Sequence, residues 1–293
     1  MAQMDAWQGD EIAFLGGGNM ARALIAGLLR QGMPAVRIRV GEPQEALRRA
    51  LAADFGVHTA ADNAPMLAGA TLIVLAVKPQ NALPALQSLH TLPPADGAVP
   101  TLLSIAAGVS VESLRQASPP AVAIVRAMPN RPALVGAGIT GLYAPETTPA
   151  PARAAAERVA RAAGQAVWLR HEAELDLVTA LSGSGPAYFF LLAEQLAAAA
   201  TALGLAAETA NLLAAQTLYG SGLLAHRALL GESPSTLSAE RSAVTSRGGT
   251  TEAALRVLAE GGFDALVQRA LQAAASRSAE LAELAAPGAN TRR

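Results

Sequence analysis

Two hydrophobic patterns divide the chain near residue 150. In the first half, short apolar runs that suit strands alternate with stretches of helical periodicity. The strand candidates are Ile12–Leu15, 36–40, 71–77, 101–105 and 122–127. The run 71–77 (TLIVLAV) is almost entirely apolar, as expected for a strand buried on both faces of a parallel sheet. Strands separated by helices predict βαβ units in a doubly wound parallel sheet, an α/β fold.

The helices between these strands carry start and stop signals. A helix over 19–31 places four leucine and isoleucine side chains at helical spacing and stops at Gly32. A second helix over 43–55 ends before Gly56. Both helices are amphipathic, which is expected of helices that cover a sheet.

The second half is expected to be almost entirely helical. Fifteen of the 18 prolines lie at or before Pro151, and proline interrupts helices. The segment 144–151 (APETTPAP) is interpreted as a connection, and 166–169 is a short strand candidate. We therefore expect two domains, 1–170 and 171–293. The helices expected in the second domain are 188–203, 206–230, 251–259 and 263–284.

Composition excludes several classes of protein. Hydrophobic residues make up 52% of the chain, but 70 of its 293 residues are alanine, a small helix former. No run approaches the roughly 20 apolar residues of a membrane span, and residues 1–10 lack the features of a secretory signal. We therefore expect a cytoplasmic protein with no membrane partner. The lack of cysteine excludes thiolate chemistry, and a net charge of −1 gives no footprint for nucleic acid.

The basic residues are unequally divided, because 21 are arginine and only Lys78 is lysine. Such a lysine is either required by function or present by chance in a surface loop. Lys78 directly follows the most apolar strand candidate and precedes Pro79. Because ligands of open α/β sheets bind beyond the carboxyl ends of strands, we place Lys78 at the mouth of the expected cleft.

The first strand candidate leads into a glycine-rich turn, 16–21 (GGGNMA), which matches the pattern G-x-G-x-x-A. Gly16 allows a tight turn, Gly18 lets backbone approach a pyrophosphate, and Ala21 lets the next helix pack on the strand. The first N–H groups of that helix are free to bind phosphate. The motif predicts dinucleotide binding.

The end of the second strand candidate bears on the choice of cofactor. Glu42 stands where an acid commonly binds the adenosine ribose of NAD, whereas Arg39 and Arg48 could reach the additional phosphate of NADP. Glu42 could equally be a first-turn acid of the helix after Pro43. Both NADH and NADPH therefore stay open.

Later loops carry further candidate chemistry. Small residues around Ala106 (SIAAG) would let a flat ring approach, and a proline-bracketed loop presents Met128 and Asn130. The loop 244–251 (VTSRGGTT) places two glycines and several hydroxyls before a helix, an arrangement that binds an anion or simply caps the helix. The four histidines are scattered, so no metal site is predicted.

Six segments follow one another along the chain: FLGGGNMARALIAGLL, AVKPQ, SIAAGV, RAMPNRPA, LSGSGPAYFF and VTSRGGTTEAAL. In this order they resemble the motifs of the Δ1-pyrroline-5-carboxylate reductase family. The resemblance implies a Rossmann-type domain followed by an all-α dimerisation domain, in a homodimer or in a homodecamer built as a pentamer of dimers. It also implies reduction of the cyclic imine 1-pyrroline-5-carboxylate to L-proline with NADPH or NADH.

The resemblance implies residue roles, which complete our candidate cofactor set alongside Glu42 and Ala106. The residues matched to the family are Gly16, Gly18, Asn19 and Met20 for the phosphates, Asn63 for the ribose, and Ala76, Val77, Lys78 and Pro79 for the nicotinamide.

The substrate carboxylate would bind backbone N–H groups of the second glycine loop, with Thr251 near the imine nitrogen. Thr251 and Lys78 are therefore the candidate catalytic residues. The candidate substrate residues are Met128, Asn130, Ser246, Gly248, Gly249, Thr250 and Thr251.

Three departures from the family pattern affect this assignment. Arg131 stands where the family usually has threonine, and Arg247 where it usually has proline. The segment 234–244 is about three residues longer than the family spacing, which blurs the correspondence upstream of Thr245.

Two other functions share parts of this pattern. A β-hydroxyacid dehydrogenase also combines a dinucleotide domain with helices, but it would use a lysine of the helical domain, and no lysine follows Lys78. A non-catalytic dinucleotide sensor would need no anion-binding loop such as 246–251.

Overall fold

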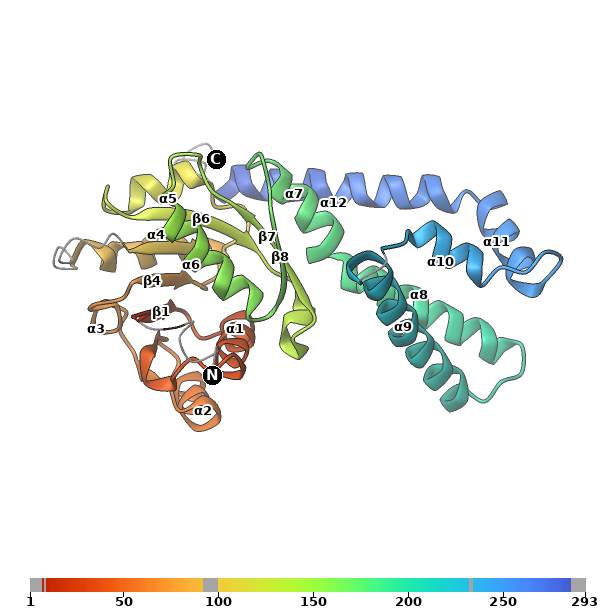
Figure 1. The fold of residues 1–293 in the computed structure, drawn as a ribbon, viewed down its shortest axis with the longest axis horizontal. Helices are drawn as coiled ribbons and strands as arrows, with labels where there is room; N and C mark the ends of the chain where they lie inside the picture. Colours follow the sequence, from red (N-terminus) through yellow and green to blue (C-terminus); the bar gives the residue numbers. More distant parts are fainter. Residues whose placement is uncertain (1–6, 8, 92–99, 232–233, 286–293) are drawn as a thin grey trace. The chain divides into compact units, whose positions relative to one another are not determined.

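The first half of the chain forms one eight-stranded sheet in the computed structural model (Figure 1). The strands are β1 (Ile12–Leu15), β2 (Ile38–Gly41), β3 (His58–Ala60), β4 (Leu72–Leu75), β5 (Thr101–Ser104), β6 (Ala123–Met128), β7 (Gly138–Tyr143) and β8 (Gly164–Trp168). Their order in the sheet is β3-β2-β1-β4-β5-β6-β7-β8. All neighbours pair in parallel except β6 and β7.

The order of the strands confirms the predicted doubly wound sheet. The chain runs from β1 to β2 and β3 in one direction, and then returns to the other side of β1 with β4. The sheet therefore changes direction between β1 and β4. In open α/β sheets, ligands bind at such a switch point, beyond the carboxyl ends of the strands.

The structure describes residues 7, 9–91, 100–231 and 234–285. The chain divides into two compact units. The sheet unit contains the chain up to Ser184 and the C-terminal part from Ala274, and the helical unit is Gly185–Ala273.

Short and long helices complete the sheet unit. They are α1 (Asn19–Arg30), α2 (Glu45–Phe55), α3 (Ala64–Leu67), α4 (Ala82–Leu86), α5 (Val111–Ala117), α6 (Ala150–Arg161), α7 (Glu174–Val178) and the last part of α12 (Phe263–Ala285). Tighter 3-10 turns occupy Ala35–Arg37, Pro79–Asn81, Gln87–Thr91 and Arg131–Val135, and a π-helical turn, η5, occupies Thr179–Gly183.

The sheet is buried on both faces, which explains its apolar sequence pattern. Alternate side chains of a strand point to opposite faces. Phe14 and Val74 belong to an apolar cluster shared with α1, α2 and α6. Leu15 and Leu75 belong to a second cluster shared with α3, α4 and α5. Every residue of β1, β4 and β5 is buried, so these strands read as unbroken apolar runs.

Several boundaries differ from the sequence-based expectation. Val36 and Arg37 lie in a 3-10 turn, so the second strand begins only at Ile38. The connection proposed for 144–151 is shorter, because α6 begins at Ala150 and takes Pro151 into its first turn, where a missing N–H costs nothing. Two strands, β3 and β7, were not predicted.

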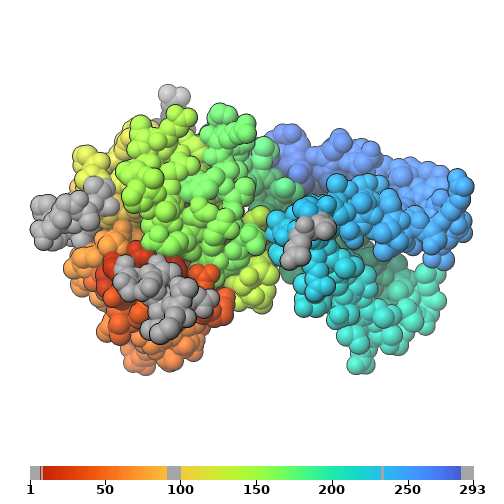
Figure 2. Space-filling view, viewed as in Figure 1, coloured from red at the N-terminus to blue at the C-terminus, as the bar shows by residue number. Residues whose placement is uncertain are grey.

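The helical unit is built from α8 (Gly185–Ala202), α9 (Ala207–Leu230), α10 (Leu237–Ala243), α11 (Thr250–Glu260) and the first part of α12. Within it, α8 packs on α9, and α10 contacts α9. Figure 2 shows this unit in cyan to blue. Many of its large apolar side chains are uncovered: Phe189, Phe190 and Leu212 are 59%, 58% and 69% exposed. Helices that are apolar on all sides need a further surface to cover them.

One continuous helical stretch, Glu174–Ala202, is long and apolar enough by composition to cross a membrane, and 17% of its most apolar window is buried. Glu194 and Gln195 interrupt its apolar runs, so the sequence pattern did not indicate it. The expectation of no membrane-spanning segment is therefore not confirmed by helix length and hydropathy. A helix that packs on another protein surface has the same composition.

Gly27 allows α1 to approach the turn that follows α6. A Cβ atom at this position would lie 2.2 Å from the carbonyl oxygen of Ala162. We expect Gly27→Ala to lower the free energy of unfolding by about 1–3 kcal/mol through overpacking, although alanine is the better helix former. Urea denaturation at fixed protein concentration measures this loss. Ala53→Ser on the exposed face of α2 is the control, and an unchanged or raised stability of Gly27→Ala would contradict the packing argument.

Candidate active site

The three glycines after β1 are required for different reasons. Gly16 has a φ of +99°, and a Cβ atom there would lie 2.9 Å from the carbonyl oxygen of Ala76. A Cβ atom at Gly17 would lie 2.6 Å from Cδ1 of Leu51. Gly18 has extended backbone, and no atom lies within 4 Å of a Cβ built there. Protein packing thus explains the first two glycines, whereas Gly18 faces open space into which a ligand fits.

The helix that follows this turn begins without a side-chain cap. Gly18 is the N-cap of α1 and makes no side-chain cap hydrogen bond, and the first turn contains no acid. Its free N–H groups and the positive end of the helix dipole suit a phosphate. The predicted phosphate contacts Asn19 and Met20 are the first two residues of α1. The turn therefore fits the pyrophosphate of a dinucleotide.

Glu42, directly after β2, is hydrogen-bonded to the glycine turn. Its Oε2 accepts a hydrogen bond from the backbone N–H of Gly17 at 2.9 Å, and its Oε1 accepts one from the N–H of Gln44 at 2.9 Å. The residue is only 6% exposed. The carboxylate that was predicted to bind the ribose thus accepts hydrogen bonds from two backbone N–H groups at the carboxyl end of β2.

The two arginines considered for a phosphate lie at opposite edges of the sheet. Arg39 donates to the carbonyl oxygen of Ala68 and pairs with Glu11 at 3.5 Å. Glu11 directly precedes β1, so Arg39 lies at the amino ends of the strands. Nη1 of Arg48 donates to the carbonyl oxygens of Glu42 and Pro43 at 2.8 and 2.7 Å. Only Arg48 of the pair therefore lies at the carboxyl edge.

Asn63 reaches the same edge from the start of α3. A Cβ atom at Gly41, the last residue of β2, would lie 2.2 Å from Oδ1 of Asn63. The glycine therefore makes room for the amide side chain, which lies against the end of β2. This position is compatible with the ribose contact predicted for Asn63.

The loop after β4 packs against the glycine turn. The N–H of Ala76 donates to the carbonyl oxygen of Leu15 at 2.8 Å, and Val77 lies against Gly16. Lys78 is exposed, and its ammonium makes no hydrogen bond or ion pair within the described part of the chain. Ala106 follows the neighbouring strand β5 and is buried. The predicted nicotinamide contacts therefore share one edge of the sheet.

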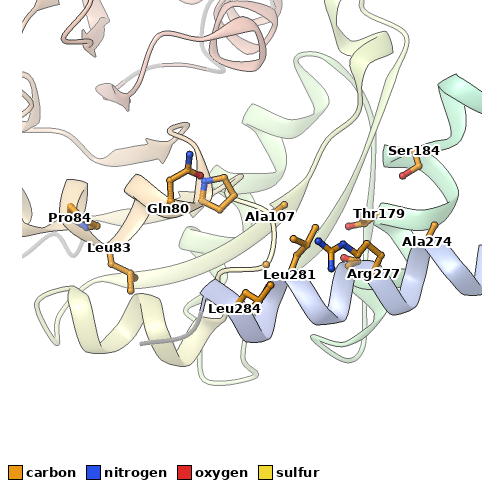
Figure 3. Close-up of a pocket in the computed structure, with 13 residues that line it drawn as sticks. Gln80, Leu83, Pro84, Ala107, Thr179, Ser184, Ala274, Arg277, Leu281 and Leu284 are labelled. Atoms are coloured by element: carbon orange, nitrogen blue, oxygen red, sulfur yellow. The ribbon is translucent and has the colours of Figure 1, made fainter. Parts of the chain in front are cut away.

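A cleft of about 780 Å³ lies beyond the ends of β4 and β5 (Figure 3). This volume suits a small-molecule site. Arg277, which pairs with Glu280 at 2.7 Å, is the guanidinium in its lining. The lining combines loops after β4 and β5 with η5 and α12, and comprises Pro79, Gln80, Leu83, Pro84, Ala107, Gly108, Thr179, Ser184, Ala274, Arg277, Ser278, Leu281 and Leu284.

Sequence reasoning missed the contribution of α12 and η5 to this cleft. Ser278 of α12 donates to Oδ1 of Asp176 at 2.7 Å, and a Cβ atom at Gly108 would lie 3.1 Å from the backbone of Ala282. These contacts join residues more than 100 positions apart. The helical periodicity of α12 indicated a helix but gave no sign of which strand ends it would cover.

Two predicted substrate residues lie beside η5 and not in the cleft lining. Asn130 is 8% exposed; its Oδ1 accepts the N–H of Ile139 at 3.0 Å, and its Nδ2 donates to the carbonyl oxygen of Ser182 at 3.1 Å. Cε of Met128 would lie 2.8 Å from a Cβ atom at Gly183. Both residues therefore hold the end of β6 against η5, which contains the first part of the LSGSGP segment.

The second glycine loop lies in the helical unit, between α10 and α11. Within it, the N–H of Gly249 donates to the carbonyl oxygen of Ser246 at 3.0 Å, and the N–H of Gly248 donates to Oε2 of Glu252 at 2.6 Å. Thr250 and Thr251 open α11, whose N-cap has no side-chain hydrogen bond. The first-turn N–H groups of these two threonines thus suit an anion better than those of the glycines. Arg247 is exposed.

Among the residues that the structure describes, no group of three or more His, Asp or Glu side chains could hold a metal ion. A doubly wound sheet, a glycine turn open at Gly18, a helix behind it without a side-chain cap, and a cleft beyond β4 and β5 together define a Rossmann-type dinucleotide-binding protein. Comparisons with known proteins identify a family within this class.

Two family models match the chain. The model described as "NADP oxidoreductase coenzyme F420-dependent" matches residues 11–108, and the model of pyrroline-5-carboxylate reductase dimerisation matches residues 172–281. The pyrroline-5-carboxylate reductase of Pseudomonas aeruginosa is 45% identical over 93% of this chain and 97% of its own length. That of Haemophilus influenzae is 42% identical, with 93% and 98% covered. The chain belongs to the pyrroline-5-carboxylate reductase family.

Solved structures agree. A pyrroline-5-carboxylate reductase from Coxiella burnetii superposes with a TM-score of 0.86 at 40% identity, covering 93% of this chain and 98% of that one. The pyrroline carboxylate reductase of Plasmodium falciparum, solved with NADP bound, gives a TM-score of 0.76 at 25% identity, with the same coverage. The predicted family and fold class are thereby confirmed.

The buried carboxylate of Glu42 provides a test of the glycine turn. Glu42→Ala leaves the buried N–H of Gly17 without an acceptor, which we expect to cost about 1–3 kcal/mol of unfolding free energy. Glu45→Ala removes a neighbouring carboxylate that pairs with Arg49 on the exposed face of α2, and we expect it to cost about 0.5 kcal/mol or less. Chemical denaturation of both variants measures the difference. Equal losses would show that the Glu42 contact does not stabilise the turn.

Proposed function

We propose that this protein is a pyrroline-5-carboxylate reductase. It takes hydride from NADPH or NADH and reduces the cyclic imine of 1-pyrroline-5-carboxylate to L-proline, the last step of proline synthesis. The observation that carries the proposal is the glycine turn open at Gly18, in a member of this family whose sheet also has a cleft beyond β4 and β5.

The sheet unit would orient the reaction. The bound nicotinamide cofactor supplies the hydride. Gly16, Gly18 and the start of α1 hold the phosphates, Asn63 and Glu42 face the ribose, and the loop 76–79 with Ala106 flanks the nicotinamide. Fixing two reactants in contact contributes on the order of 7–11 kcal/mol to lowering the barrier, so positioning is the main task of these residues.

The helical unit would recognise the substrate. The first-turn N–H groups of Thr250 and Thr251 suit a carboxylate, and the hydroxyl of Thr251 would hydrogen-bond to the imine nitrogen. A protonated imine is already electrophilic, so hydride addition needs no strong general acid. This requirement agrees with a set of candidate residues that contains no histidine and no catalytic carboxylate.

We assign dinucleotide binding to residues 1–170, and dimerisation and substrate binding to residues 171–293. The uncovered apolar side chains of α8 and α9 support a homodimer in which a second copy covers these helices. Further assembly into a homodecamer, a pentamer of dimers, and a cytoplasmic location complete the proposal.

The assay that tests this function follows the absorbance of NADPH and of NADH with the full-length protein and 1-pyrroline-5-carboxylate, and detects proline by mass spectrometry. We expect substrate-dependent oxidation of at least one cofactor with an equal yield of proline. No oxidation with either cofactor would end the proposal.

The Thr251 hydroxyl is predicted to act on the substrate and not on the cofactor. Thr251→Ala should lower kcat by about tenfold or more, the value of one hydrogen bond to a charged group, and leave the Kd of the cofactor within about twofold. Thr251→Ser keeps the hydroxyl and should recover most of the loss. Steady-state kinetics and cofactor titrations give both quantities; unchanged turnover of the alanine variant would exclude the role.

Lys78 is predicted to be required for its shape as well as its charge. Lys78→Arg keeps the cation but replaces a compact ammonium by a planar fork, and we expect kcat/KM to fall by about tenfold. Arg170→Lys, the reverse exchange at an exposed position, is the control. Kinetics of Lys78→Arg equal to those of the parent would show that a lysine is not required at this position.

A further inference from the structure

We propose that Arg48 binds the additional phosphate of NADPH and thereby sets the preference of this protein between NADPH and NADH. The inference rests on the dinucleotide site of the proposed function. It comes from the contacts of Glu42 and Arg48 at the turn between β2 and α2.

Glu42 alone would favour NADH. An ionised carboxylate only accepts hydrogen bonds, so it can receive the hydroxyls of a ribose but can offer nothing to a phosphate. Glu42 is buried, and the contacts that hold it are the backbone donors of Gly17 and Gln44. Its negative charge is therefore fixed at the end of β2, where it repels a second anion.

Arg48 supplies the opposite charge at the same turn. Its Nη1 donates to the carbonyl oxygens of Glu42 and Pro43, which fixes the guanidinium in place. The N–H groups on its Nε and Nη2 have no hydrogen-bond partner among the described residues, and Arg48 is partly buried. A planar guanidinium with free donors binds phosphate in a bidentate manner.

No neighbouring arginine duplicates this arrangement. Arg39 lies at the amino edge of the sheet with Ala68 and Glu11. Arg49 is 80% exposed and pairs with Glu45 one turn earlier in α2. Arg49 is therefore a matched control, because it is adjacent in sequence and carries the same charge but is tied to the helix surface.

The experiment measures binding of NADPH and NADH to the full-length protein without substrate, by isothermal titration calorimetry. Adenosine 2′,5′-bisphosphate and AMP serve as probes that lack the nicotinamide. Arg48→Gln should raise the Kd of NADPH and of the bisphosphate about tenfold, as expected for losing a hydrogen bond to a charged group. NADH and AMP should change by less than about twofold. Arg49→Gln should leave all four affinities within about twofold of the parent.

Two results would overturn the assignment of Arg48. One is an unchanged ratio of NADPH to NADH affinity in Arg48→Gln. The other is an equal loss for both cofactors, which would show that Arg48 merely holds the turn. Failure of the proposed function looks different: a parent protein that binds the cofactors and discriminates through Arg48 but does not reduce 1-pyrroline-5-carboxylate would leave the inference intact.

Discussion

The hydrogen bond from the Gly17 N–H to the Glu42 carboxylate is the contact on which the binding edge of the sheet depends. It joins the turn after β1 to the end of β2 and places the Glu42 carboxylate against the glycine loop. With the turn held there, Gly16 can lie against Ala76 on one side, and Gly18 is left open on the other. An acid at this position therefore has a structural task in addition to any contact with a ribose.

The two units of the chain bury their apolar surface to different extents. The sheet unit encloses one apolar cluster on each face of its strands. The helical unit buries mainly small residues such as Ala197 and Ala210, and leaves Phe189 and Leu212 exposed. A surface of this kind is stable in water when another surface covers it, which agrees with the match of this region to a dimerisation family.

The sequence predicted those features that depend on local pattern. Strands buried on both faces and a glycine turn before a helix leave a signature within about 20 residues. Features set by tertiary contacts left no such signature. In β7, for example, Gly138 and Gly141 break the apolar pattern because they make room for Ala133 and Val178. The placement of Arg39 beside Ala68 and Glu11, and the hydrogen bond of the Asn130 amide to Ser182, depend on partners distant in the sequence.

The central claim is that a dinucleotide binds at the carboxyl edge of the sheet, at the switch between β1 and β4. Hydrogen–deuterium exchange of the full-length protein with and without NADPH tests it most directly. The account predicts slower exchange in three segments, 14–22, 76–81 and 104–108, and unchanged exchange at the amino ends of the same strands. Protection at the amino ends, or none at the three segments under saturating NADPH, would contradict it.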